Sequence, residues 1–195
     1  MNKEPPAMLR GMKYNHWAAD PVKLRQMSYP QSGQLKPNGL WFDANEDWKR
    51  WCEATEFRLE NLRYRHTVTI LDTSRMLFLR SAKDIDAFTQ KFGRNPSVRI
   101  QFLQSANEMD KFASQYGRDL FADIQSQFSN YIAWGEVAEK HSGIIIVPFS
   151  RARSQTYLWY YGWYCAGGCV WDTSVIRLSK PCKRNNQEFE TKSGT

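Results

Sequence analysis

One segment near the C-terminus, residues 158–172, limits the possible folds of this chain more than any other. Its fifteen residues, LWYYGWYCAGGCVWD, hold six aromatic residues, three glycines and two cysteines. Glycine weakens a strand unless a ligand or another backbone must approach closely, and aromatic rings beside such a gap can stack on a flat ligand. An aromatic core strand with a glycine bulge explains the same residues, so both interpretations stay open at this point.

Length and charge restrict the class of protein. With 195 residues and an ordinary apolar fraction, the chain is expected to form a single domain with its own core. No apolar run is long enough for a membrane helix, and the N-terminus does not resemble a signal peptide, so we expect a cytoplasmic protein without a membrane partner. The net charge of +7 favours anionic partners, such as nucleic acid or a phosphate-bearing ligand.

The four cysteines (Cys52, Cys165, Cys169 and Cys182) lack the paired spacing of a metal site. We expect them to be reduced thiols, as in most cytosolic proteins, and we expect no metal ion.

Short strands at both ends of the chain, with helices between them, predict an α+β domain over residues 12–178. The residue pattern predicts strands at 12–16, 39–43 and 143–148, a β-hairpin of 64–71 and 75–80, and two strands around the glycine pair in 158–178. Apolar residues at helical spacing predict helices at 46–55, 81–92 and 132–141, and one or two helices within 98–130. We expect a flexible arm at 1–11, a helical insertion or lid at 95–130, a basic loop at 150–157 and a disordered tail at 179–195.

Three motifs in this order resemble the ADP-ribosyltransferase fold. The first, YNHWAADP at residues 14–21, is similar to the opening strand of the diphtheria-toxin-like branch, where a histidine and a small hydroxyl residue hold the adenosine ribose and nicotinamide of NAD. His16 matches that histidine, and Ala18 stands where the hydroxyl residue is expected. The second, KPNGLWFD at 36–43, resembles the second strand of a bacterial and phage group of such proteins. The third runs from the strand at 143–148 through CAGGC at 165–169 to residue 176.

The resemblance implies split mixed and antiparallel β-sheets with flanking helices, with NAD as the substrate and ADP-ribose as the transferred group. Some members of this group resemble toxins of toxin–antitoxin modules, including an anti-phage system with a SecB-like chaperone whose toxin modifies messenger RNA. We therefore expect a role in phage defence, a nucleic-acid acceptor with RNA favoured over DNA, and an antitoxin protein and a chaperone as partners. The alternatives are a protein-modifying ADP-ribosyltransferase and a non-catalytic, basic nucleic-acid-binding module.

The residues expected to bind NAD belong mostly to these motifs. His16 could hydrogen-bond the adenosine ribose, and backbone groups near Gly39 could hold the nicotinamide amide. Aromatic rings could stack on the nicotinamide, while Lys36, Arg151 and Arg153 could meet the pyrophosphate or a nucleic acid. The alternative for the aromatic rings is a place in the core, and the alternative for Lys36, Arg151 and Arg153 is a solvated place at the surface. The expected NAD-binding residues are His16, Trp17, Ala18, Tyr29, Lys36, Gly39, Leu40, Trp41, Tyr160 and Tyr161.

Tyr164 departs from the motif. Directly before the CAGGC segment this group is expected to carry an acid, which would stabilise the positive charge of an oxocarbenium-like transition state. A phenol with a pKa of about 10 cannot supply that charge at neutral pH. Either another acid such as Asp172 acts, or the protein binds without catalysis, or the chain is a variant inactivated at Tyr164. For Asp172, a turn-capping role through Thr173 and Ser174 is the alternative.

Overall fold

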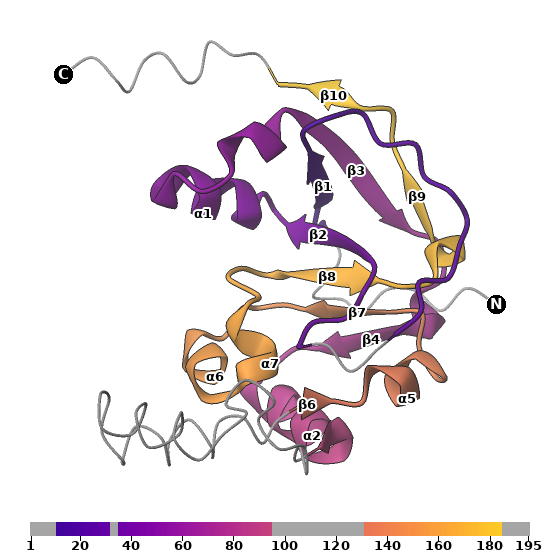
Figure 1. Ribbon diagram of the computed structural model, residues 1–195, viewed down its shortest axis with the longest axis vertical. Helices are drawn as coiled ribbons and strands as arrows, with labels where there is room; N and C mark the ends of the chain where they lie inside the picture. The colour runs from indigo at the N-terminus through magenta and orange to yellow at the C-terminus, as the bar shows by residue number, and fades with distance from the viewer. Residues whose placement is uncertain (1–10, 32–34, 95–130, 185–195) are drawn as a thin grey trace, which may run out of the picture.

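The computed structural model describes residues 11–31, 35–94 and 131–184, which form the mixed α+β fold that the sequence predicts (Figure 1). The strands of its large sheet are β1 (Tyr14–Ala18), β2 (Leu40–Ala44), β3 (Tyr64–Ile70), β4 (Met76–Leu79), β7 (Gly143–Ile146), β8 (Gly167–Val170), β9 (Ile176–Leu178) and β10 (Cys182–Lys183). A separate pair consists of β5 (Gly93–Arg94) and β6 (Tyr131–Ile132). The helices are α1 (Asp47–Thr55), α2 (Ala82–Phe92), α5 (Trp134–Ala138), α6 (Arg151–Thr156) and α7 (Leu158–Tyr161), with 3-10 turns η2 (Leu59–Leu62), η3 (Thr73–Arg75) and η4 (Thr173–Val175).

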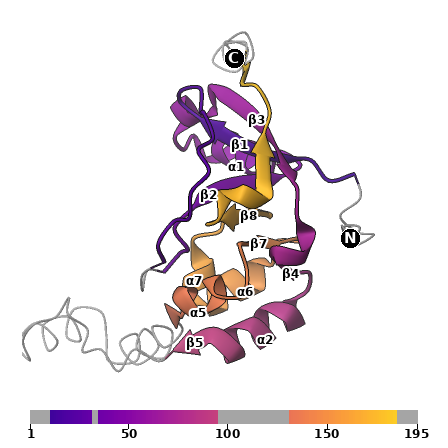
Figure 2. The ribbon, with the colours of Figure 1, turned by 90° about the vertical axis from the view of Figure 1, so that its right-hand side faces the viewer.

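The large sheet runs in the order β10-β3-β1-β2-β8-β7-β4, with β9 also paired to β3. Helices α2, α5, α6 and α7 gather at the β4–β7 end of the sheet, while α1 stands at the β1–β3 end (Figures 1 and 2). All neighbouring strands of this order are antiparallel except β4 and β7, which are parallel.

The sheet opens between β1 and β2. β1 pairs with β3 along its whole length, but with β2 only where Tyr14 faces Ala44 and Asn15 faces Asp43. β2 continues to pair with β8 from Leu40 to Asp43. The two strands therefore separate beyond Asn15, and this separation creates the space in which the candidate site lies.

Two hydrophobic clusters cover the two faces of the sheet, and β7 contributes to both. Ile144 and Ile146 pack with the helices α2, α5 and α7, whereas Ile145 packs in the other cluster with residues of β1, β2 and β8. A strand buried on both faces needs apolar residues at every position, which explains the uninterrupted β-branched run.

The predicted hairpin of residues 64–71 and 75–80 is wrong. Asp72 accepts the N–H of Ser74 and makes the expected turn, but the two strands leave it toward different neighbours. β3 pairs with β1, β9 and β10, while β4 pairs with β7. The turn signal in the sequence is real, because it describes local geometry, whereas strand pairing depends on distant segments.

Two predictions around residues 150–161 are also wrong. Residues 151–156 form helix α6 rather than a loop, and the Ser150 side chain caps it by accepting the N–H of Arg153. Residues 158–161 form the short helix α7 rather than a strand, which buries Trp159 and Tyr160 completely. The glycine pair Gly167–Gly168, which was expected between two strands, is itself part of strand β8.

The predicted disordered tail is wrong for residues 179–184. Cys182 faces Arg65 in the pairing of β10 with β3, and Arg184 forms an ion pair with Glu53 at 2.5 Å. The predicted arm at 1–10, the insertion at 95–130 and the rest of the tail, 185–195, lie outside the described residues. All four cysteines are free thiols. In the part of the chain that the structure describes, no helix has the length and apolar character needed to cross a bilayer.

Candidate functional site

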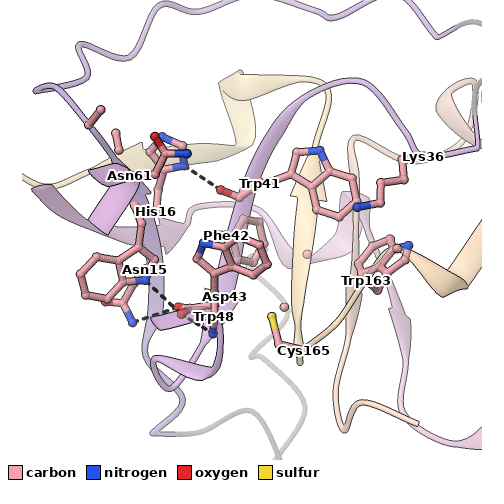
Figure 3. Close-up of a pocket in the computed structure, with 16 residues that line it drawn as sticks. Asn15, His16, Lys36, Trp41, Phe42, Asp43, Trp48, Asn61, Trp163 and Cys165 are labelled. Carbon is pink, nitrogen blue, oxygen red and sulfur yellow. Dashed lines mark hydrogen bonds between the residues drawn. The ribbon is translucent and has the colours of Figure 1, made fainter. Parts of the chain in front are cut away.

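A cavity of about 510 Å³ lies where β1 and β2 separate (Figure 3). This volume is within the usual range of small-molecule sites, roughly 300–1,000 Å³. Its lining comes from β1 and the residue after it (15–19), from β2 (41–43), from residues 162, 163 and 165 before β8, and from the first two residues of β8 (167–168). Single residues before β2 and after it complete the lining. These three segments belong to the three motifs identified in the sequence, so the fold brings the motifs to one cavity.

His16 bridges the separated strands at the cavity. Its Nδ1 lies 2.7 Å from the carbonyl oxygen of Trp41, and because a carbonyl only accepts, Nδ1 must donate. Burial lowers the pKa of His16, the bond to Trp41 opposes that shift, and the neighbouring His66 ring adds to it. The neutral ring therefore has its proton on Nδ1, which leaves Nε2 as an acceptor for a hydroxyl group.

Asp43 is the one carboxylate among the described residues that line the cavity. Its side chain is 2 % exposed and accepts three hydrogen bonds: from Trp17 Nε1 at 3.0 Å, the Trp48 backbone N–H at 3.0 Å and Asn15 Nδ2 at 3.3 Å (Figure 3). Burial raises the pKa of this carboxyl, and the hydrogen bonds from Trp17, Asn15 and the start of α1 counteract that shift. Asp43 thus places one carboxyl group at the cavity and ties β1 to α1.

Lys36 supplies the cationic group. Its Nζ lies 5.1 Å from the ring centroid of Trp41 and 5.3 Å from that of Tyr164, as in a cation–π contact with two rings. Burial lowers the pKa of Lys36, while the thiols of Cys165 and Cys169 favour its charged form. A Cβ at Gly162 would lie 2.2 Å from Lys36 Cε, so a glycine at that position leaves room for the lysine.

Of the ten residues that the sequence assigned to NAD binding, five line this cavity: His16, Trp17, Ala18, Lys36 and Trp41. The other five are Tyr29, Gly39, Leu40, Tyr160 and Tyr161, and none of them is in the lining.

These five residues lie in different surroundings. A Cβ on Gly39 would lie 2.4 Å from the carbonyl oxygen of Val170, so Gly39 packs closely against β8. Leu40 is buried. Tyr160 is also buried, and its hydroxyl accepts the Ser150 N–H. Tyr29 packs on the helical core, and Tyr161 is 61 % exposed.

Neither Tyr164, at the position where the motif expects an acid, nor Asp172, the alternative acid, is in the cavity lining. Asp172 accepts the N–H of Ser174 at 3.1 Å and pairs with Arg75 at 2.7 Å, which is the capping alternative. Hydrogen bonds to these partners outweigh its partial burial and lower its pKa. Tyr164 has a left-handed backbone, with φ of 50°, and its ring stacks on Trp51 with 4.6 Å between centroids.

The two arginine candidates lie on α6, outside the lining. Arg151 is exposed, whereas Arg153 pairs with Asp86 at 2.7 Å and thereby ties α6 to α2. A paired arginine is a weaker candidate for a phosphate than an unpaired one.

Sequence reasoning missed several lining residues. Asn15, Asp43, Trp48, Asn61, Trp163 and Cys165 all face the cavity. Asn15 and Asp43 lie inside two of the three motifs, and this position is a signal that they belong to the site. Nothing in the sequence states that they face one another across β1 and β2.

Comparison with protein family models, with curated proteins and with solved structures gives no match for this chain.

Proposed function

We propose that the cavity binds NAD and that the protein transfers ADP-ribose from NAD to a nucleic-acid acceptor, with RNA favoured. The observation that supports this best is the meeting of three motifs, separated in the chain, at one cavity: Asn15–Ala19, Lys36 with Trp41–Asp43, and five residues of the third motif, which are Gly162, Trp163, Cys165, Gly167 and Gly168. The motifs were grouped by their resemblance to a family, whereas the cavity is a feature of the fold, so the two observations are independent. The role as a toxin in phage defence, with an antitoxin protein and a chaperone in the cytoplasm, belongs to the same proposal.

The lining fits the chemical parts of a dinucleotide. Indole rings such as Trp41 offer apolar faces for a flat base or a nicotinamide ring. His16 Nε2 can accept a hydrogen bond from a ribose hydroxyl, and Lys36 can meet a phosphate. In the transfer, the bond between nicotinamide and ribose C1 breaks and nicotinamide leaves with the electron pair. An acceptor oxygen or nitrogen then bonds to C1 and releases its proton.

Asp43 is the group proposed to favour this step. Positive charge develops on the ribose as the leaving group departs, as in glycoside hydrolysis. A buried carboxylate beside it stabilises that charge more strongly than a solvated one, because water does not screen it. This assigns to Asp43 the role that the motif assigned to position 164.

The first test is thermal stabilisation by NAD. At a concentration of about 100 times Kd, a ligand stabilises a folded protein by roughly 2.7 kcal/mol, which raises Tm by several degrees for a chain of this size. His16→Ala removes the acceptor at the cavity and is expected to abolish the shift. His141→Ala, a histidine outside the lining, should keep it. Absence of any NAD shift in the wild-type protein, or a full shift in His16→Ala, contradicts the proposal.

The second test concerns Tyr164→Asp, which is expected to raise the rate of ADP-ribosyl transfer. A left-handed backbone suits Asp better than a bulky aromatic residue, and Tyr164 has φ of 50°. The new carboxylate would also stand near Lys36, whose Nζ approaches the Tyr164 ring. Transfer is measured with radiolabelled NAD at a saturating concentration of RNA, so that a change in RNA affinity does not alter the rate. Tyr164→Asn has the same backbone preference without the charge, so equal rates for the two variants would refute the expected effect.

A further inference from the structure

A group of five aromatic side chains stands next to the cavity, and four of them are outside its lining. We call it the aromatic platform: Trp48, Trp51, Phe57, Tyr161 and Tyr164. Trp51 stacks on Trp48 at 5.1 Å and on Tyr164 at 4.6 Å, with interplanar angles of 18° and 23°. Phe57 meets Trp51 edge-on at 5.3 Å, and Tyr161 meets Tyr164 at 6.5 Å. Trp48 also lines the cavity, so the platform and the cavity are continuous.

The platform is exposed to solvent. Phe57 is 39 %, Tyr161 61 % and Tyr164 38 % exposed, and these three make up half of the six exposed large hydrophobic residues in the described part of the chain. Scattered exposed apolar residues are normal, whereas a contiguous exposed group marks a binding surface. Here the group is contiguous through ring contacts, so it needs an explanation beyond chance exposure.

Backbone strain is concentrated at the same place. Five described non-glycine residues have positive φ: Asn45, Glu46, Glu56, Arg58 and Tyr164. The first two lie directly before α1, the next two directly after it, and Tyr164 is in the platform itself. Left-handed conformations of such residues cost energy and cluster where function fixes a geometry. Asn45 tolerates this conformation and Glu56 is an ordinary left-handed C-cap of α1, so the strain lies at Glu46, Arg58 and Tyr164, around these rings.

The charges around the platform suit an anionic partner. The Arg58 guanidinium lies 5.2 Å from the Phe57 ring, and Lys36 Nζ lies 5.3 Å from the Tyr164 ring. Three acids of this region are neutralised by neighbours: Glu46 pairs with Arg65 and Lys49, Asp47 with Arg50, and Glu53 with Arg184, whereas Glu56, next to Phe57, is exposed. The protein as a whole carries a net charge of +7.

We infer that the aromatic platform binds single-stranded RNA and presents it to the neighbouring cavity as the acceptor. Rings with exposed faces stack unpaired bases, while nearby cations meet the phosphates. A duplex keeps its base faces stacked on one another and therefore cannot use the rings. The continuity through Trp48 would bring a bound strand to the site of transfer. The inference that the bound RNA is the acceptor rests on the proposed function. The inference that the platform binds RNA does not.

The test measures binding of a fluorescently labelled, unstructured RNA oligonucleotide to the full chain by anisotropy. The double variant Phe57→Ser/Tyr161→Ser removes two exposed rings without opening the core, and it is expected to weaken binding at least about tenfold. Leu71→Ser is the control, because Leu71 is 45 % exposed but lies just after β3, away from the platform. It should bind like the wild-type protein. Duplex RNA of the same sequence should bind at least about tenfold more weakly.

The outcomes separate this inference from the proposed function, because NAD stabilisation is measured on the same variants. Loss of RNA affinity with an unchanged NAD shift in the double variant supports the platform. Unchanged RNA affinity in the double variant overturns it, whether or not NAD stabilises the protein. Equal affinity for single-stranded DNA overturns the assignment to RNA, and tighter binding of duplex overturns the stacking argument. If NAD never stabilises the protein while the double variant loses RNA, the proposed transfer fails and the platform stands.

Discussion

Asp43→Ala is expected to reduce ADP-ribosyl transfer at least about 100-fold and to destabilise the fold as well. The carboxylate is 2 % exposed and accepts hydrogen bonds from Trp17, Asn15 and the Trp48 backbone. Its removal leaves these donors without their acceptor, at roughly 1–3 kcal/mol for each that stays buried. We therefore expect the free energy of unfolding to fall by about 3 kcal/mol or more, measured by urea denaturation. Transfer is measured at a temperature where the variant remains folded.

Two further variants separate the charge of Asp43 from its structural bonds. Asp43→Asn keeps one acceptor oxygen but removes the negative charge, so it should lose transfer while recovering part of the stability. Asp172→Ala removes a carboxylate outside the cavity that pairs with Arg75, and its rate should change less than about twofold. If wild-type transfer is slow, the same comparison is made in a Tyr164→Asp background. A wild-type rate for Asp43→Asn would show that Asp43 holds the structure but does not act in the reaction.

Local patterns in the sequence predicted the elements that depend on local energetics. The helix at 81–92 is observed as α2, with the Ser81 side chain accepting the N–H of Asp84 as its cap. The β-branched run at 143–148 is observed as β7 over its first four residues. Capping and side-chain periodicity act within a few residues of one another, so a single sequence contains their signal.

Elements that depend on distant contacts were predicted wrongly. Residues 158–161 have the aromatic composition of a strand, yet they form α7, because the helix turn buries Trp159 and directs its indole N–H to Thr89 Oγ1 at 2.9 Å. The failed hairpin has the same cause, since the parallel pairing of β4 with β7 joins segments about 67 residues apart. Tertiary packing overrides β propensity in both cases.

The predictions for the site depended in the same way on whether the signal is local or distant in the sequence. His16, Lys36 and Trp41 were predicted from motif positions, and all three line the cavity. Asp43 was not predicted, because the motif expects its acid directly before the CAGGC segment. What makes Asp43 a candidate is the register that places it opposite Asn15 and the separation of β1 from β2 immediately beyond that pair. Strand register between separate segments is not readable from one sequence without knowing the partner.

Gly168→Ala is expected to be among the most damaging small substitutions in the fold. Gly168 lies in β8 between β2 and β7, facing Phe42 on one side and Ile145 on the other. An added Cβ would lie 2.4 Å from the Ile144 carbonyl oxygen and 2.6 Å from the Phe42 ring. One of these neighbours is backbone of a central strand, so relief requires the sheet itself to move. We expect a loss of about 3 kcal/mol or more, with Tm lower by roughly 6–12 °C in a thermal scan.

Gly135→Ala is the matched control for this prediction, because it makes the same chemical change where there is space. An added Cβ at Gly135, in helix α5, meets no atom within 4 Å. Alanine favours a helix over glycine by about 1 kcal/mol, so Tm should rise by a few degrees. We expect Gly168→Ala to lower Tm and Gly135→Ala to raise it only if close packing of β8 between β2 and β7 determines the outcome. A Gly168→Ala protein with unchanged Tm would contradict that packing and, since Gly168 lines the cavity, the shape of the proposed NAD site with it.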